Sequence, residues 1–390
     1  MTPAARVAAA IELLDGWLSG APAEKLLTTW GRQHRFAGSK DRAAIRDHVW
    51  QAIRCRRSFA ALGGAETGRG LMLGALRAAG EDPGMVFTGA GHAPAPLTPE
   101  EATRGAPPTG NAALDCPDWL APALEASLGE AFAPVMQALR HRAPVFLRVN
   151  RARISRDAAL AALAGEGIEA RAHPLASTAL EVVAGARRVQ GSRAFRSGLV
   201  ELQDAASQAV AEAVAAASGL RPGVRLLDHC AGGGGKALAL AATGAGVFAH
   251  DIDAARMRDL PARAKRAGVA VRILAPGAAR ASAPYDLVFA DAPCSGSGAW
   301  RRSPEGKWRL TPRKLDELRA VQAGILDEIH AMVAPRGRLA YATCSLLDAE
   351  NGAQVAGFLA RHRQWHLTQE RRFTPLDGGD GFYVAVMARS

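Results

Sequence analysis

The sequence of 390 residues has little cysteine, little lysine and no long apolar run. Its five scattered cysteines are too few, and odd in number, for the disulfide framework of a secreted protein, and no CxxC pair indicates a zinc site. No stretch approaches the roughly 20 apolar residues of a membrane-spanning helix. Arg6, Glu12 and Asp15 interrupt the apolar pattern that a signal peptide would need at the amino terminus. We therefore expect a cytoplasmic protein, monomeric, with no metal and no membrane partner.

Acidic residues are also scarce. Lysine and arginine total 48 against 37 acids, which gives a formal net charge of +11, and only six of these cations are lysine. The planar guanidinium group of arginine suits phosphates and base edges, so the surplus indicates a nucleic acid partner. Basic residues gather in 140–156 and 301–314, the second with Trp300 and Trp308 nearby. Interleaved cations and aromatics are typical of a groove that follows a nucleic acid backbone, although a solvated basic surface would give the same pattern.

The hydrophobic pattern divides the chain into three parts. Residues 1–140 show helical periodicity around a loop-rich middle and predict a helical domain. Residues 141–203 read as strand, helix and strand, which predicts a small α+β subdomain. In 204–390 strands alternate with helices, the pattern of an α/β domain with a doubly wound, mostly parallel sheet. Its last strand, GFYVAVMA, is predicted to form a hairpin at the sheet edge.

A glycine-rich loop follows the first strand of the α/β domain, in the sequence Asp228-His-Cys-Ala-Gly-Gly-Gly-Gly-Lys236. Glycines at a strand-to-helix turn allow a ligand to approach the backbone. A phosphate-binding P-loop is excluded, because Cys230 replaces its first glycine and Ala237 its Ser or Thr. The next strand ends at Asp251, at about the 20-residue spacing from which an acid reaches ribose hydroxyls. A plain tight turn followed by a solvated acid is the alternative.

Two cysteines follow two other predicted strands, in Asp291-Ala-Pro-Cys294 and in Tyr341-Ala-Thr-Cys344. Ligands of open parallel sheets bind beyond the carboxyl ends of the strands, so both thiols are predicted at the functional rim, on strands that could be adjacent. Buried small hydrophobes or a chance pair would give the same pattern.

These motifs resemble those of a known family. DAPCSGSG followed by RRSPEGKW, and YATCS followed by Glu350-Asn351, are similar to the RsmB/Sun (NSUN-like) family of S-adenosylmethionine-dependent RNA 5-methylcytosine methyltransferases. Residues 228–236 resemble the cofactor loop of that family, DxCAAPGGK. The helices of 1–62, with GSKDRAAIRDHVW, resemble the NusB-like RNA-binding domain that some members carry. The resemblance implies a Rossmann-like class I methyltransferase domain, and RNA, by analogy ribosomal RNA, as the partner.

The resemblance also implies roles for individual residues. Cys344 would be the nucleophile that adds to carbon 6 of the target cytosine, Cys294 would assist product release, and Asp291 would lie against the target base. The S-adenosylmethionine site would comprise Cys230, Ala231, Gly232, Gly233, Gly234, Gly235, Lys236, Asp251 and Asp291. The target base would have to leave any stack to reach this pocket.

Two departures from the family pattern leave alternatives open. Glycine replaces the proline of the cofactor loop, and the third strand ends in Ala275 and Pro276, where the family has an acid. Both changes predict a lower affinity for the cofactor. A catalytically weakened RNA-binding or ribosome assembly factor on the same fold is therefore one alternative. A methyltransferase for protein or an amino group is another, although a nitrogen nucleophile needs no thiol adduct.

Overall fold

The computed structural model describes all 390 residues, and the chain forms two compact units. Unit 1 comprises Met1–Arg142 together with Trp300–Arg309. Unit 2 comprises Ala143–Ala299 and Leu310–Ser390. Ten residues that the sequence pattern assigns to the α/β domain thus fold with the helical part. None of the helices combines the length and the apolar character that a bilayer crossing requires.

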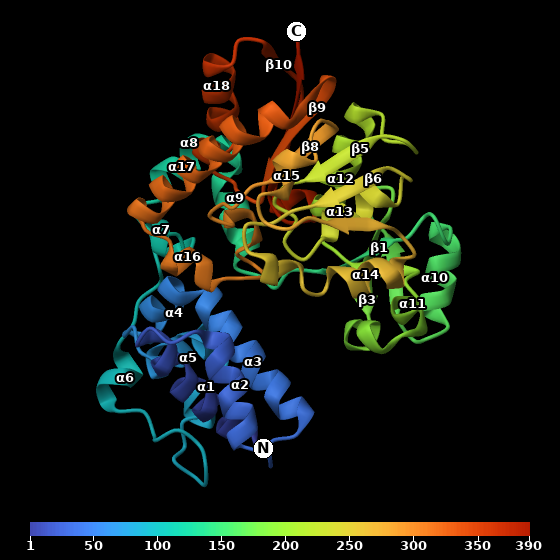
Figure 1. Cartoon of the computed structure of the whole chain (residues 1–390). Coiled ribbons are helices and arrows are strands. Elements are labelled where there is room, and N and C mark those ends of the chain that lie inside the picture. Colours follow the sequence, from blue (N-terminus) through green and yellow to red (C-terminus); the bar gives the residue numbers. More distant parts are fainter. The chain divides into compact units, whose positions relative to one another are not determined.

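Unit 1 is built of helices, and those within residues 3–78 pack around one apolar core (Figure 1). The spacing of its apolar residues puts Leu14, Ile45, Ile53 and Leu71 in the interior, each at most 1% exposed. Helices α4 and α5 approach closely at Gly74, where a Cβ atom would lie 1.9 Å from the carbonyl oxygen of Phe59. Its helices are α1 (Pro3–Leu18), α2 (Ala23–Gln33), α3 (Ser39–Arg54), α4 (Arg56–Gly63), α5 (Gly68–Ala78), α6 (Pro99–Thr103), α7 (Gly110–Ala113), α8 (Ala121–Leu128), α9 (Phe132–Leu139) and α16 (Glu305–Arg309).

The segment Trp300–Arg309 is anchored in unit 1 by buried side chains. The Nζ of Lys307 donates to the carbonyl oxygen of Arg54 at 3.1 Å, and the Nε1 of Trp308 donates to that of Ile53 at 2.6 Å. Lys307 is only 1% exposed. The prediction that this cluster lines a nucleic acid groove is therefore wrong for Lys307, because its ammonium group serves internal packing.

The buried ammonium group predicts a pH dependence of stability. Burial lowers the pKa of Lys307 from 10.5 to about 8, although the Asp115 carboxylate opposes this shift. Between these values the unfolded chain binds more protons than the folded one, so Lys307 adds stability as the pH rises from 8 to 10.5. Burial raises the pKa of Cys55 and Cys116 to about 11, and these thiols act in the opposite direction in alkaline solution.

We expect the Lys307→Met variant to lack the contribution of the lysine and to keep that of the thiols. The stability of the wild type relative to this variant should rise by roughly 3 kcal/mol across the window, as measured by thermal melting at a series of pH values. A difference between the two proteins that does not change with pH would contradict the burial of a charged Lys307.

Unit 2 begins with a four-stranded antiparallel sheet in the order β2-β3-β1-β4. Ser155 begins α10 as an N-cap, since its side chain accepts from the backbone N–H of Ala158. The strand–helix–strand pattern of the sequence corresponds to β1, α10 and β3. The elements are β1 (Val145–Val149), α10 (Arg156–Ala164), β2 (Glu169–Ala172), β3 (Ala179–Ala184), α11 (Arg193–Arg196) and β4 (Val200–Leu202).

A seven-stranded sheet in the order β10-β11-β9-β8-β5-β6-β7 forms the rest of unit 2. The five strands from β9 to β7 are parallel, and the carboxy-terminal hairpin pairs antiparallel with β9. The elements are α12 (Ala205–Ser218), β5 (Arg225–Asp228), α13 (Gly235–Ala241), β6 (Gly246–Ala249), α14 (Leu260–Ala267), β7 (Val271–Ile273), α15 (Ala278–Ala281), β8 (Tyr285–Asp291), α17 (Pro312–Ile329), β9 (Val333–Thr343), α18 (Gly352–Arg361), β10 (Trp365–Phe373) and β11 (Phe382–Arg389).

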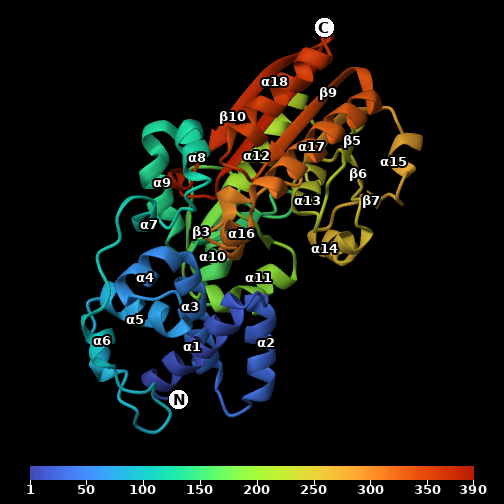
Figure 2. The same ribbon diagram turned by 90° about the vertical axis from the view of Figure 1, so that its left-hand side faces the viewer.

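Alternating strand residues bury both faces of this sheet. Phe289 packs with α12 and α13 on one face, and its neighbour Val288 packs with α17 and α18 on the other. Figure 2 shows α17 and α18 side by side. The predicted doubly wound α/β sheet is confirmed. The hairpin also forms, but its second strand, β11, lies inside the sheet and β10 takes the edge.

Candidate active site

The parallel strands end in polar residues at one edge of the sheet. Asp228 ends β5, Asp251 follows β6, and Asp291 ends β8. Cys294 follows Asp291, and Cys344 comes directly after β9. Because β6, β5, β8 and β9 are neighbours in this order, the topology gathers all five residues at the carboxyl edge.

The two cysteines of this edge lie against each other. Their Sγ atoms are 3.4 Å apart, although 50 residues separate them in the sequence. Parallel pairing of β8 with β9 fixes this geometry, together with a 2.9 Å hydrogen bond from the N–H of Gly298 to the carbonyl oxygen of Cys344. The hydrogen bond with Cys344, followed by burial and nearby negative charge, raises the pKa of Cys294 well above its usual value. Cys294 therefore keeps its proton and can donate it to the sulfur of Cys344.

A buried carboxylate ties the two cysteine loops together. Glu350 is fully buried and accepts hydrogen bonds from the N–H and hydroxyl of Ser295, next to Cys294, and from the hydroxyl of Ser345, next to Cys344. Gln322 donates to the same carboxylate at 3.0 Å. The sequence motifs assign no role to Glu350, although it stands in the Glu350-Asn351 motif that carries part of the family resemblance.

Lys236 pairs with Asp291 across the carboxyl edge. Its Nζ lies 2.6 Å from an oxygen of Asp291 and 4.7 Å from the ring centre of Phe382. Burial favours the neutral amine, but the charge and hydrogen bond of Asp291 outweigh it and raise the pKa of Lys236. The lysine therefore stays charged and remains paired with Asp291.

The glycine loop needs at least two of its glycines for conformational reasons. Gly232 and Gly234 have positive φ angles of 51° and 81°, and a Cβ atom on Gly234 would lie 2.2 Å from Leu260. The N–H of Gly232 donates to Asp251 at 2.8 Å, and Arg256 forms an ion pair with the same carboxylate at 3.1 Å. Asp251 therefore fixes the conformation of the turn. Arg256 covers Asp251 and the turn from the solvent side, since its side chain is 55% exposed.

Asp228 is the acid of this edge whose buried carboxylate lacks hydrogen-bond donors. It is 1% exposed, and neither carboxylate oxygen has a hydrogen-bond partner. Burial, followed by the charge of Asp291, raises its pKa to about 7. Lys236 pairs with Asp291 and Arg256 pairs with Asp251, so Asp228 is the acid of this edge that is left for a ligand with a cationic group. The loop glycines leave the backbone open to such a ligand, so these residues fit a cofactor that carries both an ammonium group and a ribose.

The remaining residues predicted for the cofactor site belong to the glycine loop. Cys230, Ala231, Gly233 and Gly235 lie in the same loop, and burial raises the pKa of Cys230, so this thiol stays protonated. The third strand, β7, is followed by Leu274 without an acid, as the sequence indicates. Asp286 does not replace that acid, because it accepts from the N–H of Arg225 near the opposite ends of β8 and β5.

The strand order of unit 2, the glycine loop after β5 and the acid after β6 define a Rossmann-like methyltransferase fold. Solved structures with the same fold include PH0851, which has a TM-score of 0.78 and 22% identity and covers 100% of this chain and 99% of its own. NSun6 from Pyrococcus horikoshii, solved with SFG, has a TM-score of 0.61 and 17% identity and covers 70% of this chain and 98% of its own.

Two family descriptions match the sequence: 16S rRNA methyltransferase RsmB/F over residues 217–387, and the RsmF/B-like ferredoxin-like domain over 116–190. Ribosomal RNA small subunit methyltransferase B from Erwinia tasmaniensis is 35% identical to this chain over 288 residues. The protein of the same name from Klebsiella pneumoniae is 35% identical over 290 residues. Each match covers 70% of this chain and 66% of the relative, slightly less than two thirds of its length. These matches place residues 116–190 and 217–387 in the RsmB/F family.

Proposed function

We propose that this protein transfers a methyl group from S-adenosylmethionine to carbon 5 of a cytosine in RNA, through a covalent bond between Cys344 and the base. The observation that carries the proposal is the 3.4 Å contact between the sulfurs of Cys294 and Cys344, beside the Asp291–Lys236 pair. Small-subunit ribosomal RNA is the proposed substrate, since the relatives are named as methyltransferases of that RNA.

The chemistry requires a thiol because carbon 5 of cytosine is a poor nucleophile. Cys344 adds as a thiolate to carbon 6, and the resulting enamine makes carbon 5 nucleophilic. Asp291, held by Lys236, accepts a hydrogen bond from the exocyclic amino group of the base and so orients the ring for attack. After methylation a base removes the proton from carbon 5, the bond between sulfur and carbon 6 breaks, and Cys344 leaves as a thiolate. Cys294 stabilises that thiolate by donating its S–H.

The cofactor site is proposed at the glycine loop. S-adenosylmethionine supplies an electrophilic methyl group on a sulfonium ion. Asp251 would hold its ribose, residues 230–236 would surround its amino-acid part, and Asp228 would face its ammonium group. The fixed backbone of the loop, bound to Asp251 through Gly232, supports cofactor binding despite the missing proline.

We expect Asp251→Ala to weaken S-adenosylmethionine binding by roughly tenfold or more, because the loop loses its anchor and the ribose its acceptor. Isothermal titration calorimetry measures the affinity. Asp259→Ala serves as the control, since Asp259 lies in the same part of the chain but its side chain is 76% exposed. A wild-type protein that binds RNA but not S-adenosylmethionine would favour the weakened assembly factor instead.

Bisulfite sequencing tests the reaction. RNA from cells lacking this protein is compared with RNA from the same cells after its reintroduction, and a cytosine protected only in the second sample identifies the product. Ribosomal RNA with unchanged protection at every cytosine would contradict the proposed substrate, and methylation of a nitrogen or a protein would contradict the proposed chemistry.

A further inference from the structure

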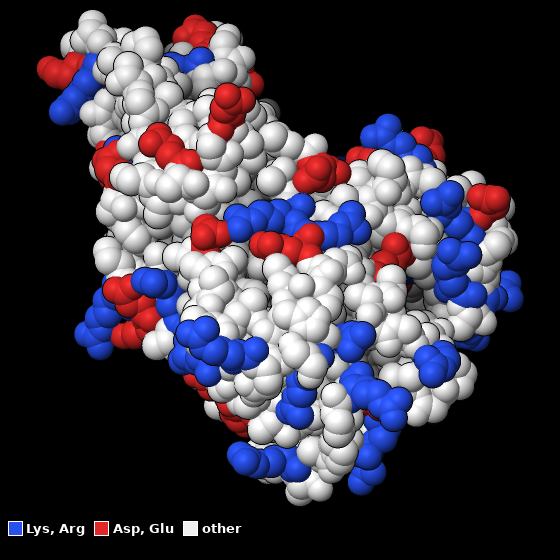
Figure 3. Space-filling view, turned by 90° about the horizontal axis from the view of Figure 1, so that it is seen from above, with Lys and Arg blue, Asp and Glu red and all other residues white.

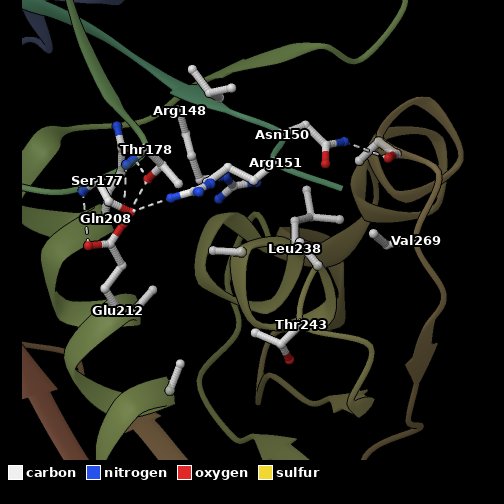
Figure 4. A pocket seen from close by; sticks show the side chains of 16 residues that line it. Arg148, Asn150, Arg151, Ser177, Thr178, Gln208, Glu212, Leu238, Thr243 and Val269 are labelled. Atoms are coloured by element: carbon white, nitrogen blue, oxygen red, sulfur yellow. Dashed lines mark hydrogen bonds between the residues drawn. The ribbon is translucent and has the colours of Figure 1, made fainter. Parts of the chain in front are cut away.

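A cavity lies in unit 2, on the side of α13 that faces away from the large sheet. Its volume is about 210 Å³, and it is bounded by α12, α13, the end of β1 and the turn before β3 (Figure 4). Small side chains of the two helices leave the space open. The apolar wall consists of Ala211, Ala215, Leu238, Ala239, Ala242 and Val269.

Polar groups line the opposite side of this cavity. Figure 4 shows Arg148 and Arg151 along one side and Ser177, Thr178 and Glu212 together on another. Glu212 accepts hydrogen bonds from the N–H and hydroxyl groups of both Ser177 and Thr178, so its carboxylate is fully engaged. The Oδ1 of Asn150 is buried without a partner, which leaves an acceptor on the wall for an N–H donor.

Arg148 connects the cavity to the cofactor loop. Its side chain is 7% exposed, and its Nη1 donates to the carbonyl oxygen of Gly235 at 2.6 Å and to the side chain of Gln203. Gly235 is also the first residue of α13, so the wall of the cavity and the end of the glycine loop are parts of one continuous element.

Arg151 lines the cavity, Arg153 and Arg156 follow it closely in the sequence, and none of the three has an acidic partner. Arg151, Arg153 and Arg156 donate only to a hydroxyl or to backbone carbonyls and form no ion pair. The other arginines of 140–156 differ, because Arg140 and Arg142 pair with acids and Arg148 is buried. Basic side chains are spread over the face of the molecule shown in Figure 3, with acids between them. What distinguishes these arginines from the other surface cations is their position beside an apolar cavity, because net charge alone is spread over the whole face.

Size limits what can occupy the cavity. Its volume of about 210 Å³ exceeds the ~150 Å³ of an apolar cavity that accepts benzene, but is smaller than the ~300 Å³ at which pockets for drug-sized ligands begin. One planar base fits these limits, and a whole dinucleotide does not. Apolar side chains can enclose a base that has left its stack, and cations beside them can hold its phosphate.

We infer that this cavity receives one unpaired base of the substrate RNA other than the target cytosine, with Arg151, Arg153 and Arg156 holding the adjoining phosphates. The inference rests on the proposed function, since the occupant is part of the RNA. It adds a second anchor for the RNA, joined to the cofactor loop through Arg148.

Variants that fill the cavity, called the slot below, test the inference on the full-length protein. Ala242→Leu and Ala239→Leu place a larger side chain in the cavity, whereas Ala216→Leu makes the same change on α12 at an exposed position outside it. Fluorescence anisotropy with a labelled single-stranded oligoribonucleotide should show roughly tenfold weaker binding for the first two variants and unchanged binding for the third. Arg151→Ala should reduce the magnitude of the slope of log affinity against log salt concentration by about 1, because one phosphate contact is lost. This measurement tests the phosphate contact while the apolar wall of the cavity stays intact.

The outcomes separate this inference from the proposed function. Slot variants that bind RNA as tightly as the wild type, while the wild type methylates RNA, overturn the second anchor and leave the function intact. A wild type that methylates no RNA overturns the function, and the anisotropy measurement still reports on the slot. If calorimetry shows that adenosine or cytidine monophosphate binds the wild type but not Ala242→Leu, with RNA affinity unchanged, the cavity is a site for a free nucleotide and the inference is overturned.

Discussion

Replacing Cys344 by alanine is expected to abolish methyl transfer, with a loss of roughly 10⁴-fold or more, the range seen when a covalent nucleophile is removed. No other thiol can take its place. Cys294 is the nearest, at 3.4 Å, but burial and the charge of Glu350 still raise its pKa when Cys344 is absent, so it stays protonated at neutral pH. The measurement is transfer of a labelled methyl group from S-adenosylmethionine to ribosomal RNA, under single-turnover conditions so that product release does not limit the rate.

The loss should be confined to the chemical step. The sulfur of Cys344 is not bonded to the glycine loop, so the affinity for S-adenosylmethionine should stay within about threefold of the wild type, a change of less than 1 kcal/mol. Cys116→Ala is the matched control, because it removes a buried thiol of unit 1 that lies outside the site. A Cys344→Ala protein with full activity would refute the covalent mechanism.

The sheet and its functional edge could be predicted from local sequence because both depend on short-range patterns. Apolar runs ending in Asp228, Asp291 or Cys344 identify parallel strands whose ends meet at one edge. The order of the strands in the sheet could not be predicted from these short-range patterns. Apolar and polar residues do not alternate in the edge strand β10, and most of its residues between Trp365 and Phe373 are exposed. It is a strand because it pairs with β11, which follows it in the sequence.

Long-range contacts explain what the sequence pattern missed. In isolation RRSPEGKW reads as a basic surface segment, but Trp17 of α1 donates to Glu305 and α3 accepts from Lys307 and Trp308, which turns the segment inward. Glu350 is a similar case. Its sequence neighbourhood gives no sign of burial, and only the fold brings Ser295 and Ser345 to its carboxylate from two strands. The roles of Cys294 and Cys344, the NusB-like character of the helices and the boundaries of the three domains stay predictions.

Replacing Cys294 by alanine is expected to have the opposite effect on the covalent bond. The Cys344 sulfur must leave carbon 6 as a thiolate, and Cys294 is placed to stabilise it with a hydrogen bond across 3.4 Å. Without that donor the adduct should break down more slowly than it forms, so protein covalently bound to RNA should accumulate. A denaturing gel after incubation with RNA and S-adenosylmethionine would show a slowly migrating, RNA-containing band that the wild type lacks.

The double variant Cys294→Ala, Cys344→Ala distinguishes this adduct from adventitious crosslinking, because it lacks the nucleophile and should give no band. Cys294→Ser retains a donor at the same position, so it should give less adduct and a faster turnover than Cys294→Ala. A Cys294→Ala protein that turns over at the wild-type rate without a band would show that the neighbouring thiol takes no part in release. Because Glu350 positions both loops, Glu350→Gln should slow formation and breakdown of the adduct together, whereas the loss of Cys294 acts mainly on breakdown.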